Sequence, residues 1–343
     1  MQALILVGGE GTRLRPLTSR VAKPIVTLVD RPFIAYMLEW LRRYGVSDVV
    51  LSCGFLADGV RNELGDGERY GLTLHYVEEP EPLGTGGALR YAGDLLGDRF
   101  LVCNGDILTD IDLGAQLAQH ERTAAVATLA LIDVEDPTAY GLVRCAPDGA
   151  VLEFIEKPSP EVAATTAPHV SAGAYVLERS VLELIAPGRP VSLEREIWPA
   201  LIGNGLYGYL ASGYWLDIGT PERYLQATFD ILARTVHTDR EPAHHLPVIG
   251  AHCEIGAGAE IGELVVLGDR VSVGEGAIVD RSVILAGAQI GPGAIVRDSI
   301  VAERAKIGPH TELEGGVVIG EDAQIGERQL IASGARIEPG ARM

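Results

Sequence analysis

The segment Met1–Leu17, MQALILVGGEGTRLRPL, decides the fold class of the N-terminal half. Residues 2–7 are a largely aliphatic run that leads directly into glycines, which is typical of a first β-strand and a tight loop rather than of a signal peptide. In α/β proteins, such a loop at the carboxyl end of a parallel strand is a common nucleotide site. Its three glycines let backbone N–H groups approach a polyphosphate, and Arg13 adds positive charge. The loop lacks the third glycine of a dinucleotide fingerprint and the closing Gly-Lys-Ser/Thr of a Walker loop.

The first 235 or so residues alternate short aliphatic runs with amphipathic stretches, which indicates strands joined by helices in a mostly parallel sheet. The first helix follows Arg31-Pro32-Phe33 and ends at Gly45, because proline favours helix starts and glycine favours helix ends. We expect a Rossmann-like α/β domain over residues 1–236. The predicted strands are residues 2–7, 48–52, 72–77, 99–103 and 124–131, and the further predicted helices are residues 86–96, 112–121, 193–202 and 221–233.

From residue 247 onward an aliphatic residue recurs every six positions, and the register slips by one residue twice. A six-residue period is the signature of a parallel β-helix, in which each triangular coil uses three hexads. An irregular glycine-rich surface would not keep so many positions in phase. We therefore expect a left-handed β-helix of about five coils over residues 248–343, joined to the first domain by residues 237–247. The sixteen repeating positions are Ile249, Ile255, Ile261, Leu267, Val273, Val279, Ile284, Ile290, Val296, Val301, Ile307, Leu313, Ile319, Ile325, Ile331 and Ile337.

The composition limits the classes of partner. The chain has 343 residues, with 28 Lys plus Arg against 47 Asp plus Glu and a formal net charge of −19. Because a phosphate track needs clustered positive charge, this balance argues against a nucleic acid or an anionic membrane as partner. No apolar run approaches the roughly 20 residues of a membrane span, so we expect a cytoplasmic protein. Only three of the 28 basic residues are lysines: Lys23, Lys157 and Lys306.

The four cysteines lie far apart and form no Cys-x-x-Cys pair. We therefore expect small buried hydrophobic residues rather than a zinc site or a disulfide framework. The four positions are Cys53, Cys103, Cys145 and Cys253.

Several short motifs accompany the glycine loop along the first 230 residues. In chain order they are Lys23-Pro24, Glu81–Gly87, Asn104-Gly105-Asp106, Tyr140-Gly141, Glu156-Lys157-Pro158, Ser171-Ala172-Gly173 and Trp215–Thr220. Together with the glycine loop, these motifs resemble the signature set of the sugar-1-phosphate nucleotidyltransferases, also called nucleotide-sugar pyrophosphorylases. The hexapeptide tail is similar to that of the longer members, so the resemblance spans nearly the whole chain.

The resemblance implies a reaction in which a sugar 1-phosphate attacks the α-phosphorus of a nucleoside triphosphate and pyrophosphate leaves. The attacking group is already an anion, so the protein needs no Ser, Cys or His nucleophile and mainly positions two polyanions. By resemblance, Arg13 contacts the β- and γ-phosphates with Lys23 beside it, and Lys157 holds the sugar phosphate. Asp106 and Asp217 would bind Mg²⁺, which prefers hard oxygen ligands.

The remaining site residues are also implied by the resemblance. Considered without the motif set, Asp106 would cap a turn, Asp217 would face solvent, and Glu156-Lys157 would be a solvated charge pair. The predicted nucleotide site comprises Leu6, Gly8, Gly9, Gly11, Thr12, Arg13, Gly84, Thr85 and Asn104, and the predicted sugar-phosphate site comprises Tyr140, Gly141, Glu156, Lys157, Ser171 and Gly173.

Finer resemblances bear on the base and the sugar. Glu81–Gly87, Ser192–Pro199 and Gly213–Pro221 are similar to mannose-1-phosphate guanylyltransferases, whereas thymidylyl-transferring relatives usually carry a Gln-centred base segment. We therefore predict guanylyl transfer from GTP to mannose 1-phosphate, with thymidylyl transfer to glucose 1-phosphate as the alternative. Ser171 stands where that branch commonly has Asn, which replaces an amide by a shorter hydroxyl, so a heptose or a cyclitol phosphate also fits.

Other classes of function remain open. A non-catalytic regulatory subunit of the same fold would be expected to lack some of the five charged residues assigned to the phosphates and the metal. All five are present: Arg13, Lys23, Asp106, Lys157 and Asp217. A β-helix that transfers acyl groups would need a basic group such as His252 or His310, although each is typical of a solvated turn. The pair His244-His245 has no third ligand spaced to form a metal site. We also expect homo-oligomers to form through the β-helix.

Overall fold

The computed structural model describes residues 1–164, 169–239 and 246–343, which divide into two compact units. The first unit comprises residues 1–9 and 37–215, and the second comprises residues 10–36 and 216–343. Residues 165–168 and 240–245, the latter including the pair His244-His245, lie outside the described residues. Within the described part, no helix is both long and apolar enough to cross a membrane.

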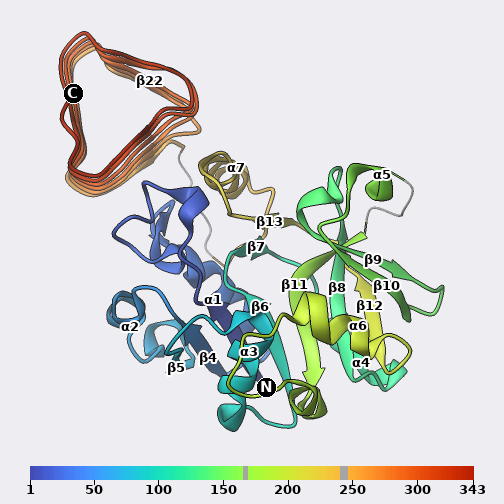
Figure 1. Cartoon of the computed structure of the whole chain (residues 1–343). Helices are drawn as coiled ribbons and strands as arrows, with labels where there is room; N and C mark the ends of the chain where they lie inside the picture. The colour runs from blue at the N-terminus through green and yellow to red at the C-terminus, as the bar shows by residue number, and fades with distance from the viewer. Residues whose placement is uncertain (165–168, 240–245) are drawn as a thin grey trace. The chain divides into compact units, whose positions relative to one another are not determined.

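The first unit is built on a nine-stranded mixed sheet (Figure 1). Its strands are β1 (Gln2–Val7), β4 (Asp48–Cys53), β5 (Thr73–Glu78), β6 (Arg99–Asn104), β8 (Ala127–Asp133), β9 (Gly141–Cys145), β10 (Val151–Glu156), β11 (His169–Glu178) and β12 (Leu206–Leu210). β6, β1, β4 and β5 are parallel neighbours in that order, which is the Rossmann-like half. β11 runs antiparallel to β6 and also pairs with β8 and β9, while β12 is parallel to β8.

The α/β prediction is confirmed, and each predicted strand is present with its ends shifted by at most three residues. The strand β11 was not predicted, because its segment Ser171–Ala174 consists of small residues that give no hydrophobic alternation. It is nevertheless buried along most of its length, since it lies between two other strands. Small residues therefore hide a central strand from a reading based on periodicity.

Each helix predicted in the first unit is present, with one change of internal geometry, whereas α2 and α5 were not predicted. The predicted helix over 193–202 is a π-helical segment, Leu193–Ile197, followed by α6. Pro199 has no N–H to donate, so a regular α-helical hydrogen-bond ladder cannot run through this segment. The helices are α1 (Phe33–Arg43, which begins in the second unit), α2 (Ala57–Leu64), α3 (Gly84–Tyr91), α4 (Leu113–Thr123), α5 (Pro160–Ala163) and α6 (Trp198–Leu201), with 3₁₀ turns at Glu68–Tyr70, Gly93–Leu95, Pro137–Ala139 and Arg179–Leu184.

The cysteines are free thiols, and none of them pairs in a disulfide. Cys53 and Cys103 are buried in the strands β4 and β6, and burial raises the pKa of both thiols to about 12. These two thiols agree with the expectation of small buried residues, because the reactive thiolate form is suppressed, whereas Cys145 and Cys253 are only half-buried.

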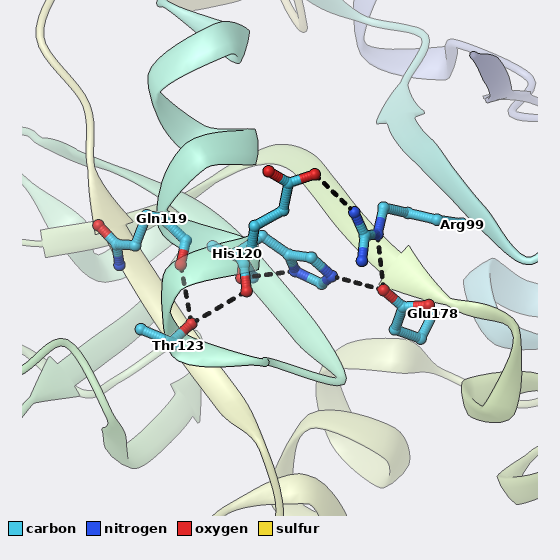
Figure 2. Close-up of polar contacts among 7 residues, drawn as sticks. Arg99, Gln119, His120, Thr123 and Glu178 are labelled. Carbon is cyan, nitrogen blue, oxygen red and sulfur yellow. Dashed lines mark hydrogen bonds and ion pairs between the residues drawn. The ribbon is translucent and has the colours of Figure 1, made fainter.

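A buried histidine in α4 joins the helix to the sheet (Figure 2). The His120 ring is 1% exposed, and its Nδ1 lies 2.8 Å from the Thr128 hydroxyl of β8. Its Nε2 lies 3.1 Å from the carboxylate of Glu178, which also accepts a 2.6 Å hydrogen bond from Arg99. Burial lowers the pKa of His120, and this effect outweighs the hydrogen bond to Glu178, which acts in the opposite direction. The ring is therefore neutral in the folded protein near neutral pH.

The lowered pKa of His120 predicts that the first unit loses stability as the pH falls below about 6.5, the ordinary histidine value. In this window the unfolded chain binds the proton more readily than the folded chain does. Urea midpoints followed by tryptophan fluorescence report on this unit, because Trp40, Trp198 and Trp215 all lie in it. H120Q should flatten the pH dependence, while H75Q, at an exposed histidine, should not; equal slopes for H120Q and the unmodified protein would contradict the argument.

The second unit combines residues 10–36 with the chain from residue 216 onward. The buried Tyr224 of α7 donates a hydrogen bond from its hydroxyl to the carbonyl of Thr27, which ties two segments about 200 residues apart. The Thr220 hydroxyl caps α7 by accepting from the amide of Arg223. The elements outside the β-helix are 3₁₀ turns at Thr12–Leu14 and Lys23–Ile25, β2 (Thr27–Leu28), β3 (Arg31–Pro32) and α7 (Pro221–Leu232); β7 (Ile107–Thr109) lies in the first unit, and β13 (Trp215–Asp217) crosses the boundary.

Residues 248–337 form the predicted β-helix, seen down its axis as stacked triangular coils (Figure 1). Three parallel sheets make its walls, and each of the sixteen predicted aliphatic positions lies on a strand. Sheet D is β14 (Val248–Ile249), β17 (Val266–Leu267), β20 (Val283–Ile284), β23 (Ile300–Val301), β26 (Val318–Ile319) and β29 (Arg336–Ile337); sheet E is β15 (Glu254–Ile255), β18 (Ser272–Val273), β21 (Gln289–Ile290), β24 (Lys306–Ile307) and β27 (Gln324–Ile325); sheet F is β16 (Glu260–Ile261), β19 (Ile278–Asp280), β22 (Ile295–Arg297), β25 (Glu312–Leu313) and β28 (Leu330–Ile331).

The two register slips fall at the same corner of successive coils, where sheet F leads into sheet D. Buried serines close both of these shorter turns. The Ser282 hydroxyl donates to the Asp280 carbonyl at 2.7 Å and accepts from the Ser299 amide at 3.1 Å. On the surface, Arg281 donates to the Asp298 carboxylate at 2.7 Å. The slips are therefore a stacked turn type rather than breaks in the repeat.

The outer surface of sheet D is apolar and covered. Because side chains alternate along a strand, the first residue of each sheet D strand points outward, away from the β-helix core. Yet Val266, Val283, Ile300 and Val318 are at most 1% exposed. Beside β20, the Arg281 guanidinium lies over the Phe229 ring of α7, 4.7 Å from its centroid. Sheet D is thus the wall of the β-helix that meets the remainder of the second unit.

Candidate functional site

The first unit places Asp106 at the carboxyl edge of its parallel strands. Leu6 of β1 pairs with Asn104 of β6, and the Gly105 amide donates to the Leu6 carbonyl at 2.9 Å. A Cβ on Gly105 would lie 2.5 Å from Cγ1 of Val7 and 2.7 Å from the Leu6 oxygen, so only glycine fits. Asp106 follows directly and is half-buried at this edge. The close approach of two backbones therefore fixes the position of the carboxylate.

Asn104 and Gly173 meet where β6 and β11 lie side by side. Gly173 has a φ of +72°, and a Cβ there would lie 2.7 Å from Nδ2 of Asn104. The pairing of β11 with β8 shifts between Ser171 and Tyr175, which is a bulge. The Ser171 hydroxyl donates to the Tyr175 hydroxyl at 3.2 Å. The structure thus brings together Asn104, Asp106 and Gly173, which the sequence assigned to different parts of the site.

Glu156 and Lys157 lie at the end of β10, opposite the predicted Tyr140-Gly141 pair. Glu156 pairs with Gly141 across the strands, and the Lys157 amide donates to the Tyr140 carbonyl at 2.9 Å. Lys157 is exposed and has a φ of +51°, a left-handed conformation that costs energy for a residue with a side chain. The Tyr140 ring packs edge-on against Trp215 at 5.3 Å between centroids. The strained backbone of Lys157 is typical of functional positions.

Glu194 joins the predicted Thr85 to the Glu156 corner. Its carboxylate accepts from the hydroxyls of Thr85 at 2.8 Å and Ser192 at 2.7 Å. Burial raises the pKa of Glu156, the negative charge of Glu194 raises it further, and Lys157 opposes both effects. Two carboxylates and two hydroxyls thus share one region, which can accept and donate hydrogen bonds to a polyhydroxylated ligand.

The glycine loop is divided between the units: Gly8 and Gly9 lie in the first, and the loop from Glu10 onward lies in the second. Gly11 has a φ of +61°, and its carbonyl accepts from the Thr18 hydroxyl at 2.7 Å. The stem of Lys23 packs along this turn, because a Cβ on Gly11 would lie 3.2 Å from Cβ of Lys23. Among the described residues, the amides of Gly11, Thr12 and Arg13 have no acceptor, as expected for the first amides of a 3₁₀ turn. The loop therefore presents free N–H groups beside a lysine.

Arg13 and Asp217 lie next to each other in the second unit. A Cβ on Gly219 would lie 3.0 Å both from Nη2 of Arg13 and from Oδ2 of Asp217. The other carboxylate oxygen, Oδ1, accepts a 2.6 Å hydrogen bond from Arg223 of α7. Two arginines, Arg13 and Arg223, thus lie near this carboxylate.

The structure divides the predicted charged set. Asp106 and Lys157 lie in the first unit, whereas Arg13, Lys23 and Asp217 lie in the second. No group of three or more His, Cys, Asp or Glu residues that could hold a metal occurs in the described parts of the chain.

Sequence reasoning missed Glu194 and Arg223 as members of the site. The motif that contains Glu194 was noticed, but the contact with Thr85 spans 109 residues and has no local signal. Arg223 lies six residues after Asp217, and the helix start at Pro221 turns its side chain back to that carboxylate. The histidines considered for acyl transfer, His252 and His310, lie at exposed turns of the β-helix, with φ of +60° and +55°.

Two families of known proteins match the chain, one before the predicted linker at residues 237–247 and one from its last residues onward. Residues 2–234 match the family described as "Nucleotidyl transferase", and residues 245–341 match the "GMPPB C-terminal domain". The chain belongs to the nucleotidyl transferase family. The resemblance inferred from the glycine loop and its companion motifs is therefore confirmed at the level of the family.

Two relatives of this nucleotidyl transferase have names that describe guanylyl transfer to mannose 1-phosphate. The "Mannose-1-phosphate guanylyltransferase" of Mycobacterium tuberculosis is 39% identical over 236 residues, 68% of this chain and 65% of that protein. The "Mannose-1-phosphate guanyltransferase" of Candida albicans is 35% identical over 356 residues, 99% of this chain and 96% of that protein. Among solved structures, HddC of Yersinia pseudotuberculosis in complex with GMP-PN is 27% identical with a TM-score of 0.57, covering 66% of this chain and 97% of the other.

The crowding at Gly105 predicts that G105A lowers the unfolding free energy of the first unit by roughly 1–3 kcal/mol, because backbone atoms of β1 must move. Urea unfolding followed by tryptophan fluorescence measures the change. The matched control is G9A, since a Cβ on Gly9 meets nothing within 4 Å. Equal urea midpoints for G105A and G9A would contradict the prediction, because they would show that this edge of the sheet accommodates a Cβ at residue 105.

Proposed function

We propose that this nucleotidyl transferase transfers guanylyl from GTP to mannose 1-phosphate or a mannose-like analogue, releasing pyrophosphate and the GDP-sugar. The observation that carries the proposal is the match to guanylyltransferases along 99% of the chain, β-helix included. The complex of HddC with GMP-PN adds a guanine nucleotide in a protein of the same fold. Self-association through the β-helix belongs to the proposal as well.

In the proposed reaction the chain mainly neutralises and orients two polyanions. Arg13 and Lys23 would contact the β- and γ-phosphates, with the free amides of Gly11–Arg13 facing the same group. Lys157 would hold the phosphate of the sugar. No side chain needs to act as a nucleophile, because the phosphate oxygen that attacks is already negatively charged.

A divalent metal fits the donor set, and we propose Mg²⁺. Asp106 and Asp217 provide hard carboxylate oxygens, which Mg²⁺ prefers as ligands. When bound, the metal would supply positive charge that offsets the phosphates as they approach each other. Arg223 would keep Asp217 oriented, since it donates a hydrogen bond to Oδ1 of that carboxylate.

The region around Glu156 and Glu194 would bind the hydroxyls of the sugar. Glu156 has a raised pKa, so a hydroxyl that donates to its carboxylate compensates for burial and for the neighbouring charge. Gly84 and Thr85 would border the base and ribose, with Gly84 packed so tightly on Val191 that a Cβ would lie 2.7 Å from its carbonyl oxygen. Ser171, held by the Tyr175 hydroxyl, would face the same ligand.

Pyrophosphate release with each of several nucleoside triphosphates and sugar 1-phosphates tests the proposal directly. We expect GTP with mannose 1-phosphate, or with a mannose-like acceptor, to give the highest kcat/KM. Higher rates with dTTP for every acceptor would contradict guanylyl transfer. Absence of pyrophosphate release with all combinations would instead favour the regulatory subunit.

The scarcity of lysine predicts that K23R and K157R each lower kcat/KM at least tenfold, about 1.4 kcal/mol of transition-state stabilisation. A guanidinium is a wide planar fork, whereas an ammonium is a compact charge that fits a crowded phosphate site. K306R is the matched control, because Lys306 lies on the exposed outer surface of sheet E. Unchanged kcat/KM in both K23R and K157R would show that lysine is not specifically required at these positions.

A further inference from the structure

Arg336 breaks the pattern of the wall to which it belongs. It occupies an outward position on β29, where the register places it beside Val318 of β26. Its side chain is 39% exposed, whereas the outward residues of the four strands before it, from Val266 to Val318, are buried. A guanidinium that continues an apolar row needs polar partners to compensate for lost hydration. The outward row of sheet D reads Val248, Val266, Val283, Ile300, Val318 and Arg336.

The partners of Arg336 are in the glycine loop and at the start of α7. Its Nη1 donates to the carbonyl of Arg13 at 2.7 Å and to the carbonyl of Arg15 at 3.3 Å. Its Nη2 lies 3.9 Å from the carboxylate of Glu222, in the first turn of α7. All of these residues belong to the second unit. One guanidinium thus bridges two segments that are more than 200 residues apart in the sequence.

Both segments held by Arg336 carry a proposed site residue. The 3₁₀ turn whose carbonyls accept from Arg336 is the turn on which the Arg13 side chain is mounted. The segment that leads into α7 contains Asp217, whose carboxylate is next to the Arg13 guanidinium. Because Arg336 occupies the carbonyl side of the turn, it fixes the orientation of the peptide groups without occupying the Arg13 side chain itself.

We propose that Arg336 is a positioning residue, through which the last coil of the β-helix holds the glycine loop and Arg13 in place for the nucleoside triphosphate. The inference rests on the proposed function, and it gives the β-helix a part in nucleotide binding. It assigns no contact between Arg336 and substrate. Its action is through the carbonyls of Arg13 and Arg15.

A second contact between the β-helix and the same loop is weaker. Arg20 lies 3.5 Å from the carboxylates of both Glu321 and Asp322, and Arg304 binds those carboxylates too. Exposed ion pairs contribute little, and these carboxylates already have a partner. The hydrogen bonds of Arg336 to two carbonyls are directional and charge-assisted, so they define the loop more closely than the pairs of Arg20 do.

The test separates binding of the two substrates. In the full-length protein, R336A should raise KM for the nucleoside triphosphate about tenfold and leave KM for the sugar 1-phosphate unchanged. Calorimetric titration with GTP alone should show the same tenfold weakening. R336K should give an intermediate effect, because an ammonium reaches one carbonyl but lacks the planar fork that engages two. R297A, at an exposed arginine on β22, is the matched control and should match the unmodified protein.

A purely structural role would give a different result. It would lower the thermal unfolding midpoint and reduce kcat in proportion to folded protein, with both KM values unchanged. Unchanged GTP affinity in R336A and R336K, or an equal rise of both KM values, would overturn the inference. If R336A does not fold, R336K carries the same criterion. If the unmodified protein turns over no substrate but binds GTP, and R336A binds GTP more weakly, the proposed function fails while the positioning role stands.

Discussion

The shared carboxyl edge of parallel strands is the constraint on which the candidate site of the first unit depends. β1 and β6 pair in parallel, so the loops that follow them emerge at the same edge. The amide of Gly105 then bonds to the carbonyl of Leu6, which leaves no room for a side chain at that residue. Asp106 follows a fixed backbone, and its carboxylate needs no flexible loop to place it. The bulge in β11 brings Gly173 against Asn104 at the same edge.

Many elements of the fold and many candidate site residues could be predicted from the sequence, because they are encoded in patterns that span only a few residues. The run over residues 2–7 and the hexads over 249–337 are patterns within a few residues, and both gave elements with nearly the predicted ends. The charged set also came from short motifs. Glu194 and Arg336 were not found, because their partners lie 109 and 323 residues away. Hydrophobic periodicity records which side chains face a core, but not which distant backbone accepts a hydrogen bond.

The acidic net charge is compatible with a polyanionic ligand because the interactions that matter are short-ranged. At physiological ionic strength, exposed charges more than about 8–10 Å apart are largely screened. In the second unit, Arg13 and Arg223 flank a single carboxylate, Asp217, and Lys23 packs along the glycine turn. The first unit contributes Lys157 beside two carboxylates. The net charge of −19 therefore characterises the molecule as a whole and leaves these local balances unaffected.

The β-helix carries a second period that explains how one repeat serves different purposes. Every third hexad returns to the same wall, so outward residues 18 or 17 positions apart share a sheet. On sheet E they are polar or charged, from Glu254 to Gln324. On sheet D they are aliphatic up to Arg336, and those from Val266 to Val318 are buried. The inward positions need only be aliphatic, which leaves the outward positions free to vary wall by wall. Sheet D can thus bury an apolar surface against the remainder of the second unit and end in a cation that reaches the loop carrying Arg13. The core of the β-helix is nearly uniform, so its specific contacts are made by the outward side chains, which the core does not constrain.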